Sequence, residues 1–170
     1  MTSTILTDRW MDALLDAANE LATTSLGAEE TVVLEGADAA DAAPDVSALR
    51  SEDANRVAGS YVPLVGSACS VELGVLGWAG SCSALARALL YLEEEEELSA
   101  EDMADAINEV ANIIGGGLKQ RMNDADPSFK LGLPLFVHGY VQASSHLHTR
   151  SVAVALGPAT VRLVLLATAM

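Results

Sequence analysis

The amino-acid sequence predicts an α+β fold in which an antiparallel sheet packs against long amphipathic helices. Three stretches carry apolar residues at helical steps of three and four, at 8–24, at 80–92 and after Ser99. Short apolar runs separated by turns containing Gly or Ser interleave with these helices, which is typical of hairpins. The chain has 170 residues, 51% of them hydrophobic, so we expect a single domain over 1–170 with a core of ordinary size.

The first half of the chain predicts a helix, a short strand, a loop and a hairpin. The helix at 8–24 has a capping residue and an apolar face, supplied by Thr7 or Asp8 and then Trp10, Leu14, Ala17 and Leu21. A strand over 31–34 precedes an acidic loop excursion near 36–58, which is rich in Ala, Asp and Ser without periodicity. Two apolar runs at 61–65 and 70–76 flank a Gly/Ser turn and predict a hairpin, and the second helix follows it.

The third helix has the clearest start. Ser99 followed three residues later by Asp102 resembles a capping box, and acidic side chains in a first turn interact favourably with the helix dipole.

Three strand candidates close the chain, at 131–137, 152–156 and 161–166, with turns at Gly139 and at Gly157-Pro158 between them. The last two are rich in Val and Leu and have few of the charges that protect an exposed sheet edge. We therefore expect one edge to pair with a second copy of the chain, giving a homodimer or a larger assembly.

Composition excludes several classes of function. The formal net charge of −15 leaves no basic surface for nucleic acid. No apolar run approaches the roughly 20 residues that span a bilayer, and the N-terminus lacks a basic stretch before a hydrophobic one, so we expect a cytoplasmic protein. Cys69 and Cys82 lack C-x-x-C spacing, and His146-Leu-His148 has no further ligand at metal-site spacing, so no bound metal is expected. There is no P-loop or G-x-G-x-x-G, so no nucleotide cofactor is indicated.

A polar stripe runs along one side of the third helix, opposite an apolar stripe. On a helical projection the apolar side holds Met103, Ile107, Val110, Ile114 and Leu118, and the polar side holds Asp102, Asp105, Glu109, Asn112 and Lys119. Glu109 and Asn112 are three residues apart, so their side chains emerge together, with Asp105 one turn before. A carboxylate can pair with a cation of a partner, and a carboxamide can hold a water. An ordinary solvated helix face has the same spacing, so these residues alone leave both interpretations open.

The residues after Asn112 add a second signal. Asn is a poor helix former, and each of Gly115, Gly116 and Gly117 costs about 1 kcal/mol relative to alanine in a helix interior. Such a conflict between propensity and position is expected at a functional surface.

The segment Asp105 to Lys119 resembles the signature helix of the CheC/CheX/FliY phosphatase family of bacterial chemotaxis. That signature is an acid or Ser, then E-x-x-N, then a Gly-containing stretch that ends in Lys. The segment Leu133-Pro134 to Gly139 is similar to the family's proline-containing strand some twenty residues past the Asn. The similarity spans nearly the whole chain, and its single complete E-x-x-N indicates the CheX branch. The family's common Gly-Asn after the helix is here Gly116-Gly117.

The resemblance implies that the protein removes phosphate from the phosphorylated aspartate of a CheY-like response regulator. Glu109 would pair with a lysine of the regulator and Asn112 would orient the attacking water, and both are expected to be exposed. Asp105, Gly116 and Lys119 would contact the partner, and Mg²⁺ would be held by the receiver domain of the regulator. The alternatives are a catalytically silent adaptor that binds a receiver domain and a structural subunit of a motility assembly.

A second stripe on the first helix repeats the spacing with Asp12, Asp16 and Asn19. It could be a degenerate copy of the site, as some relatives carry two. Asp16 is one methylene shorter than Glu and should not reach a partner lysine, so we expect a vestige or a solvated face.

Overall fold

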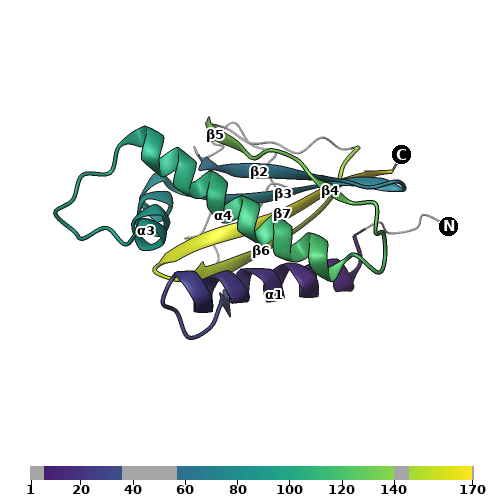
Figure 1. Ribbon diagram of the computed structural model, residues 1–170, viewed down its shortest axis with the longest axis horizontal. Coiled ribbons are helices and arrows are strands. Elements are labelled where there is room, and N and C mark those ends of the chain that lie inside the picture. Colours follow the sequence, from purple (N-terminus) through teal and green to yellow (C-terminus); the bar gives the residue numbers. More distant parts are fainter. Residues whose placement is uncertain (1–5, 36–56, 140–145, 170) are drawn as a thin grey trace.

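In the computed structural model, which describes residues 6–35, 57–139 and 146–169, three helices pack on one face of a seven-stranded sheet (Figure 1). The elements in chain order are α1 (Asp8–Ser25), β1 (Val32–Val33), β2 (Val57–Val65), β3 (Cys69–Gly77), α3 (Ala79–Leu90), α4 (Ala100–Arg121), β4 (Lys130–Leu131), β5 (Leu135–Gly139), β6 (His148–Leu156) and β7 (Ala159–Ala169). The strand order is β1-β6-β7-β3-β2-β4, with β5 also paired to β2, and every pairing is antiparallel. This confirms the predicted fold class.

The core lies between the sheet and the helices. Alternate residues of each strand point to the same face, so one face of the sheet supplies Val62, Leu64, Leu73, Val75, Leu163 and Leu165. Buried side chains of the helices pack against them, among them Leu14, Leu85, Ile107 and Ile114. Each such side chain stabilises the fold by roughly 1.5–3 kcal/mol relative to an exposed position. Burial of this face holds α1 and α4 side by side across the sheet (Figure 1).

The local signals in the sequence predicted most of these elements. The hairpin forms between β2 and β3, with Val65 opposite Ser70. Ser99 is the N-cap of α4, and its hydroxyl accepts a hydrogen bond from the Asp102 amide at 3.0 Å. The same hydroxyl donates to the Asp102 carboxylate at 2.7 Å, so the carboxylate bonds the capping side chain. At α1 the N-cap is Thr7, whose side chain makes no capping bond.

The predicted strand at 131–137 is two short strands, β4 and β5. Both short strands pair with β2, but the register shifts by one residue between them, since Leu131 lies opposite Leu64 and Leu135 opposite Tyr61. Pro134, which has no amide hydrogen to donate to a ladder, lies within this shift. Among the residues predicted as the loop at 36–58, Val57 and Ala58 begin β2, and 36–56 lie outside the described residues.

The expectation of an unprotected edge at the closing strands is wrong for β7. It lies inside the sheet between β6 and β3, and a chain segment from the other end of the sequence, β1, pairs with β6 at Val154 and Ala155. None of the helices in the described ranges is long and apolar enough to cross a bilayer.

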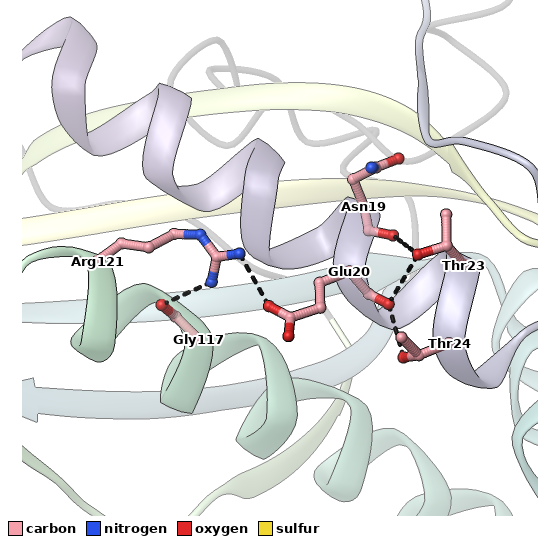
Figure 2. Close-up of polar contacts among 6 residues, drawn as sticks. All are labelled: Asn19, Glu20, Thr23, Thr24, Gly117 and Arg121. Carbon is pink, nitrogen blue, oxygen red and sulfur yellow. Dashed lines mark hydrogen bonds and ion pairs between the residues drawn. The ribbon is translucent and has the colours of Figure 1, made fainter.

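Small side chains and one ion pair join α1 to α4. A Cβ atom on Gly117 would lie 3.0 Å from the Cβ of Ala17, so the glycine lets the two helices approach closely. The guanidinium of Arg121 donates to the Glu20 carboxylate at 2.8 Å and to the Gly117 carbonyl at 3.1 Å (Figure 2). These contacts hold the C-terminal half of α4 against α1.

Candidate functional site

The polar stripe of α4 lies on the side of the helix that faces away from the sheet. Asp105 and Glu109 are exposed, and Asn112, Gly116 and Lys119 are half-buried. The opposite side is fully buried at Ile107, Val110, Ile114 and Leu118. The predicted division of the helix into an apolar and a polar side is therefore confirmed.

Asn112 is half-buried, which corrects the expectation that both members of the E-x-x-N pair are exposed. It follows Asn108 by four residues and therefore stands directly above it on the helix surface. Asn108 lies on the flank of α4 that turns toward β2, where its side-chain oxygen accepts a hydrogen bond from the Ser60 hydroxyl at 2.7 Å. The same flank therefore partly shelters Asn112.

Three asparagines lie in the described helices, and two of them have a structural partner. Asn19 accepts a hydrogen bond from the backbone amide of Thr31 at 2.8 Å, and Asn108 accepts the bond from Ser60. In the described part of the chain no hydrogen bond or ion pair engages the side chain of Asn112 or Glu109. The carboxamide and the carboxylate are both available to an external group.

Ser60 is fully buried, and its bond to Asn108 is directional. Apolar packing alone would tolerate small rotations of α4 about its axis, whereas this hydrogen bond specifies one orientation. Sequence reasoning missed both residues. The available signal was a serine at a core-facing position of an apolar strand.

Two of the three glycines have a packing reason, which corrects the expectation that the whole run marks a functional surface. A Cβ atom on Gly115 would lie 2.9 Å from both Val62 Cγ1 and Leu131 Cδ1, and Gly117 meets α1 as described above. Among the described residues nothing lies within 4 Å of such an atom on Gly116, which is on the polar stripe.

An open hollow of about 390 Å³ continues the stripe beyond Asn112. It is lined by Gly116, Lys119, Gln120, Asn123 and Leu131. Lys119 has no hydrogen bond or ion pair within the described ranges. Leu131 comes from β4, so this feature could not be predicted from the sequence of the helix alone.

The stripe on α1 lacks a free carboxamide. Asp12 and Asp16 are exposed, but Asn19 holds the Thr31 amide, and its side chain points away from α4 (Figure 2). This gives Asn19 a structural role and supports the interpretation of the α1 stripe as a solvated face.

Within the described ranges no group of three or more His, Cys, Asp or Glu side chains is placed to hold a metal ion. Cys82 is buried, and burial raises the pKa of its thiol to about 11. Cys69 is half-buried, and burial, followed by the nearby Asp126 carboxylate, raises the pKa of its thiol. Both thiols are therefore poor nucleophiles at neutral pH.

Several solved structures share this fold. A CheC-like superfamily protein from Shewanella sp. PV-4 is 15% identical, with a TM-score of 0.67 over 95% of this chain and 99% of that one. Chemotaxis protein CheX from Vibrio vulnificus is 14% identical, with a TM-score of 0.67 over 93% and 98%. The CheX–CheY–BeF₃–Mg²⁺ complex from Borrelia burgdorferi matches with 17% identity and a TM-score of 0.57, over 93% of this chain and 96% of that one.

No protein of curated function matches the chain with significance. The sequence model of the family described as "Chemotaxis phosphatase CheX" matches residues 58–156, more than half of the chain and including all of α4. The chain belongs to the chemotaxis phosphatase CheX family.

Proposed function

We propose that the protein hydrolyses the aspartyl-phosphate of a CheY-like response regulator, and that Glu109 and Asn112 carry the reaction. The observation that supports this most directly is the free carboxamide of Asn112. It is a poor helix former with no partner in the described part of the chain, whereas the other helical asparagines each hold a structural hydrogen bond. Membership of the CheX family and the fold similarity to the CheX–CheY complex support this substrate class.

The chemistry needs positioning more than a covalent intermediate. The Asn112 carboxamide can accept a hydrogen bond from a water and donate one to a phosphoryl oxygen, which places the water oxygen in line with the phosphorus. A new P–O bond forms to the water, and the P–O bond to the aspartate breaks. The electron pair of that bond leaves with the aspartate carboxylate, and the water proton passes to the phosphate or to solvent.

Glu109 acts on the partner. Its exposed carboxylate pairs with a lysine of the receiver domain and so fixes the receiver against α4. Asp105, Gly116 and Lys119, on the same stripe, complete the surface in contact with the receiver. Mg²⁺ belongs to the receiver, and a receiver substrate would place the reaction in the cytoplasm.

The test is the rate at which phosphorylated receivers lose phosphate. Candidate receivers are phosphorylated with a small-molecule phosphodonor, and the loss is timed with wild-type protein, Asn112→Ala and Glu109→Ala. Asn112→Ala should lower kcat by orders of magnitude and leave receiver binding intact, because it acts mainly in the transition state. Glu109→Ala should lower kcat and also weaken binding.

Glu101→Ala is the matched control, since Glu101 is also an exposed glutamate of α4 but lies two turns before Glu109. Near-normal dephosphorylation by Asn112→Ala would remove this residue from the mechanism and favour the receiver-binding adaptor. If no receiver loses phosphate faster with the wild-type protein, while one binds, the adaptor is again the better interpretation.

We also propose that two copies of the chain associate. Leu133 is 89% exposed and Leu135 is 66% exposed, and both lie at the β4–β5 end of the sheet. Large exposed apolar side chains beside a strand edge favour association. Light scattering that returned 17.6 kDa across micromolar concentrations would contradict the dimer.

A further inference from the structure

The cationic side chains of this acidic protein differ in whether they have a partner within the described chain. Arg9, Arg121 and Arg150 each form an ion pair with a carboxylate, to Asp124, Glu20 and Asp8 respectively. Arg87 donates to the carbonyl of Glu93, and Arg162 to the hydroxyl of Ser151. Of the cations in the described ranges, only the two lysines, Lys119 and Lys130, have neither a hydrogen bond nor an ion pair.

The two lysines lie in different surroundings. Lys119 is half-buried and lines the hollow on α4 together with Gly116, Gln120 and Asn123. Lys130 is exposed on β4 and alternates with Leu131, so it points to the face of the strand away from the hollow. Only Lys119 shares a surface with the proposed catalytic pair.

The stripe therefore carries acids before Asn112 and a lysine after it. Glu109 and Lys119 are ten residues apart, which is about 15 Å along the helix axis at 1.5 Å per residue. Asn112 and Gly116 lie between them. At the Lys119 end the hollow excludes part of the solvent, which strengthens an ion pair relative to a fully exposed one.

We propose that the hollow receives an acidic side chain of the receiver domain, whose carboxylate pairs with Lys119 and fixes the direction in which the receiver docks. The inference rests on the proposed function. With the receiver in the productive direction, its lysine meets Glu109 and its acid meets Lys119. A receiver rotated by half a turn would place like charges together at both ends, which disfavours the unproductive complex.

The charge of the protein indicates that the group entering the hollow is acidic. The formal net charge of −15 repels acidic groups from most of this protein, so a free lysine in a hollow is the local feature that attracts one. Gly116 has no side chain, and no atom of the described residues lies within 4 Å of a Cβ placed there, so they leave the helix surface open to an approaching side chain.

The experiment compares Lys119→Glu with Lys130→Glu. Both variants replace one positive charge by one negative charge, so the change in net charge, and with it the long-range interaction with the receiver, is the same in the two. For the receiver identified by the phosphatase assay, Lys119→Glu should raise KM at least tenfold and leave kcat within twofold of wild type. Lys130→Glu should change both within about twofold. The difference in KM should shrink in 0.5 M salt, because salt screens the pair.

A second measurement does not depend on catalysis. Binding of each variant to the receiver loaded with beryllofluoride and Mg²⁺ gives Kd by calorimetry, and exposed acids of the receiver are changed to lysine one at a time. One of these receiver variants should restore the affinity of Lys119→Glu while weakening that of the wild-type protein.

Equal Kd values for the two lysine variants would overturn the proposal, as would the failure of every receiver variant to restore binding. A fall in kcat at constant KM would also overturn it, because Lys119 would then act on the phosphoryl group. None of these outcomes contradicts the roles of Glu109 and Asn112, which Asn112→Ala tests separately.

Discussion

Gly115 and Gly116 are neighbours in α4, so the same substitution to alanine at each separates the effect of packing against the sheet from that of helix propensity. Alanine in place of either residue should gain about 1 kcal/mol from propensity alone. At Gly116 no atom of the described ranges lies within 4 Å of the new Cβ atom. We therefore expect Gly116→Ala to stabilise the fold by about 1 kcal/mol.

At Gly115 the same methyl group meets the core. Its Cβ would lie 2.9 Å from Val62 Cγ1 and from Leu131 Cδ1, closer than the normal carbon contact of about 3.5–4.0 Å. Val62 is fully buried and branched at Cβ, so it has no free rotamer with which to withdraw. Overpacking of this kind costs about 1–3 kcal/mol. Gly115→Ala should thus be less stable than Gly116→Ala by about 1–3 kcal/mol, and between neutral and about 2 kcal/mol less stable than wild type.

Urea unfolding followed by circular dichroism measures the difference. The unfolding midpoints of the two variants should move in opposite directions, or only that of Gly116→Ala should rise, with equal m-values if the denatured states are alike. Gly115→Ala with a midpoint equal to or above that of Gly116→Ala would refute the reasoning, because it would mean that α4 does not depend on a close approach to β2.

Four further predictions concern residues outside α4. Burial, followed by the Glu72 carboxylate, raises the pKa of the Tyr61 hydroxyl to about 12 from its ordinary 10.0. The unfolded chain therefore releases this proton first, so stability should fall as the pH rises from 10 to 12, and Tyr61→Phe should remove that slope in unfolding measured by fluorescence. Hydrogen bonds from Ser128 and Ser67 lower the pKa of the Asp126 carboxyl, so the stability that the carboxylate contributes is lost as the pH falls below the ordinary 3.8. The free energy of unfolding of Asp126→Ala should therefore fall less steeply with acid than that of wild type. Asn19→Ala should cost about 1 kcal/mol in urea unfolding because a backbone amide loses its acceptor. Asp16→Ala combined with Asn19→Ala should leave phosphatase activity nearly unchanged, and a tenfold loss in a folded double variant would contradict the assignment of a single site.

Helix boundaries and faces were predictable because they depend on neighbouring residues. The Ser99 cap and the spacing of Ile107, Ile114 and Leu118 are local properties of the chain, and the structure has the same start and the same buried side. The helical spacing that puts these apolar residues on one side also puts Glu109 on the opposite, exposed side.

Strand order and edges were not predictable from the same evidence. Apolar runs indicate that strands exist, but not which strands pair. The two residues of β1 pair with two residues of β6, and a separate β5 pairs with β2, only because distant segments meet in the folded chain. The predicted strand at 131–137 had the right residues and the wrong continuity, since its interruption is a one-residue shift in its pairing with β2.

The meaning of the polar and small residues on the helices was also decided by tertiary structure. Helix propensity does not distinguish Asn19, Asn108 and Asn112, or Gly115 and Gly116, and only the resemblance to the family's signature singled out Asn112 and Gly116. Contacts formed in the folded chain gave Asn19 and Asn108 a hydrogen bond and gave Gly115 a packing partner, whereas Asn112 and Gly116 have none among the residues that the structure describes. A residue pattern specifies which face of a helix a side chain occupies, and only the neighbours that the fold brings to that face determine whether the side chain is available to a partner.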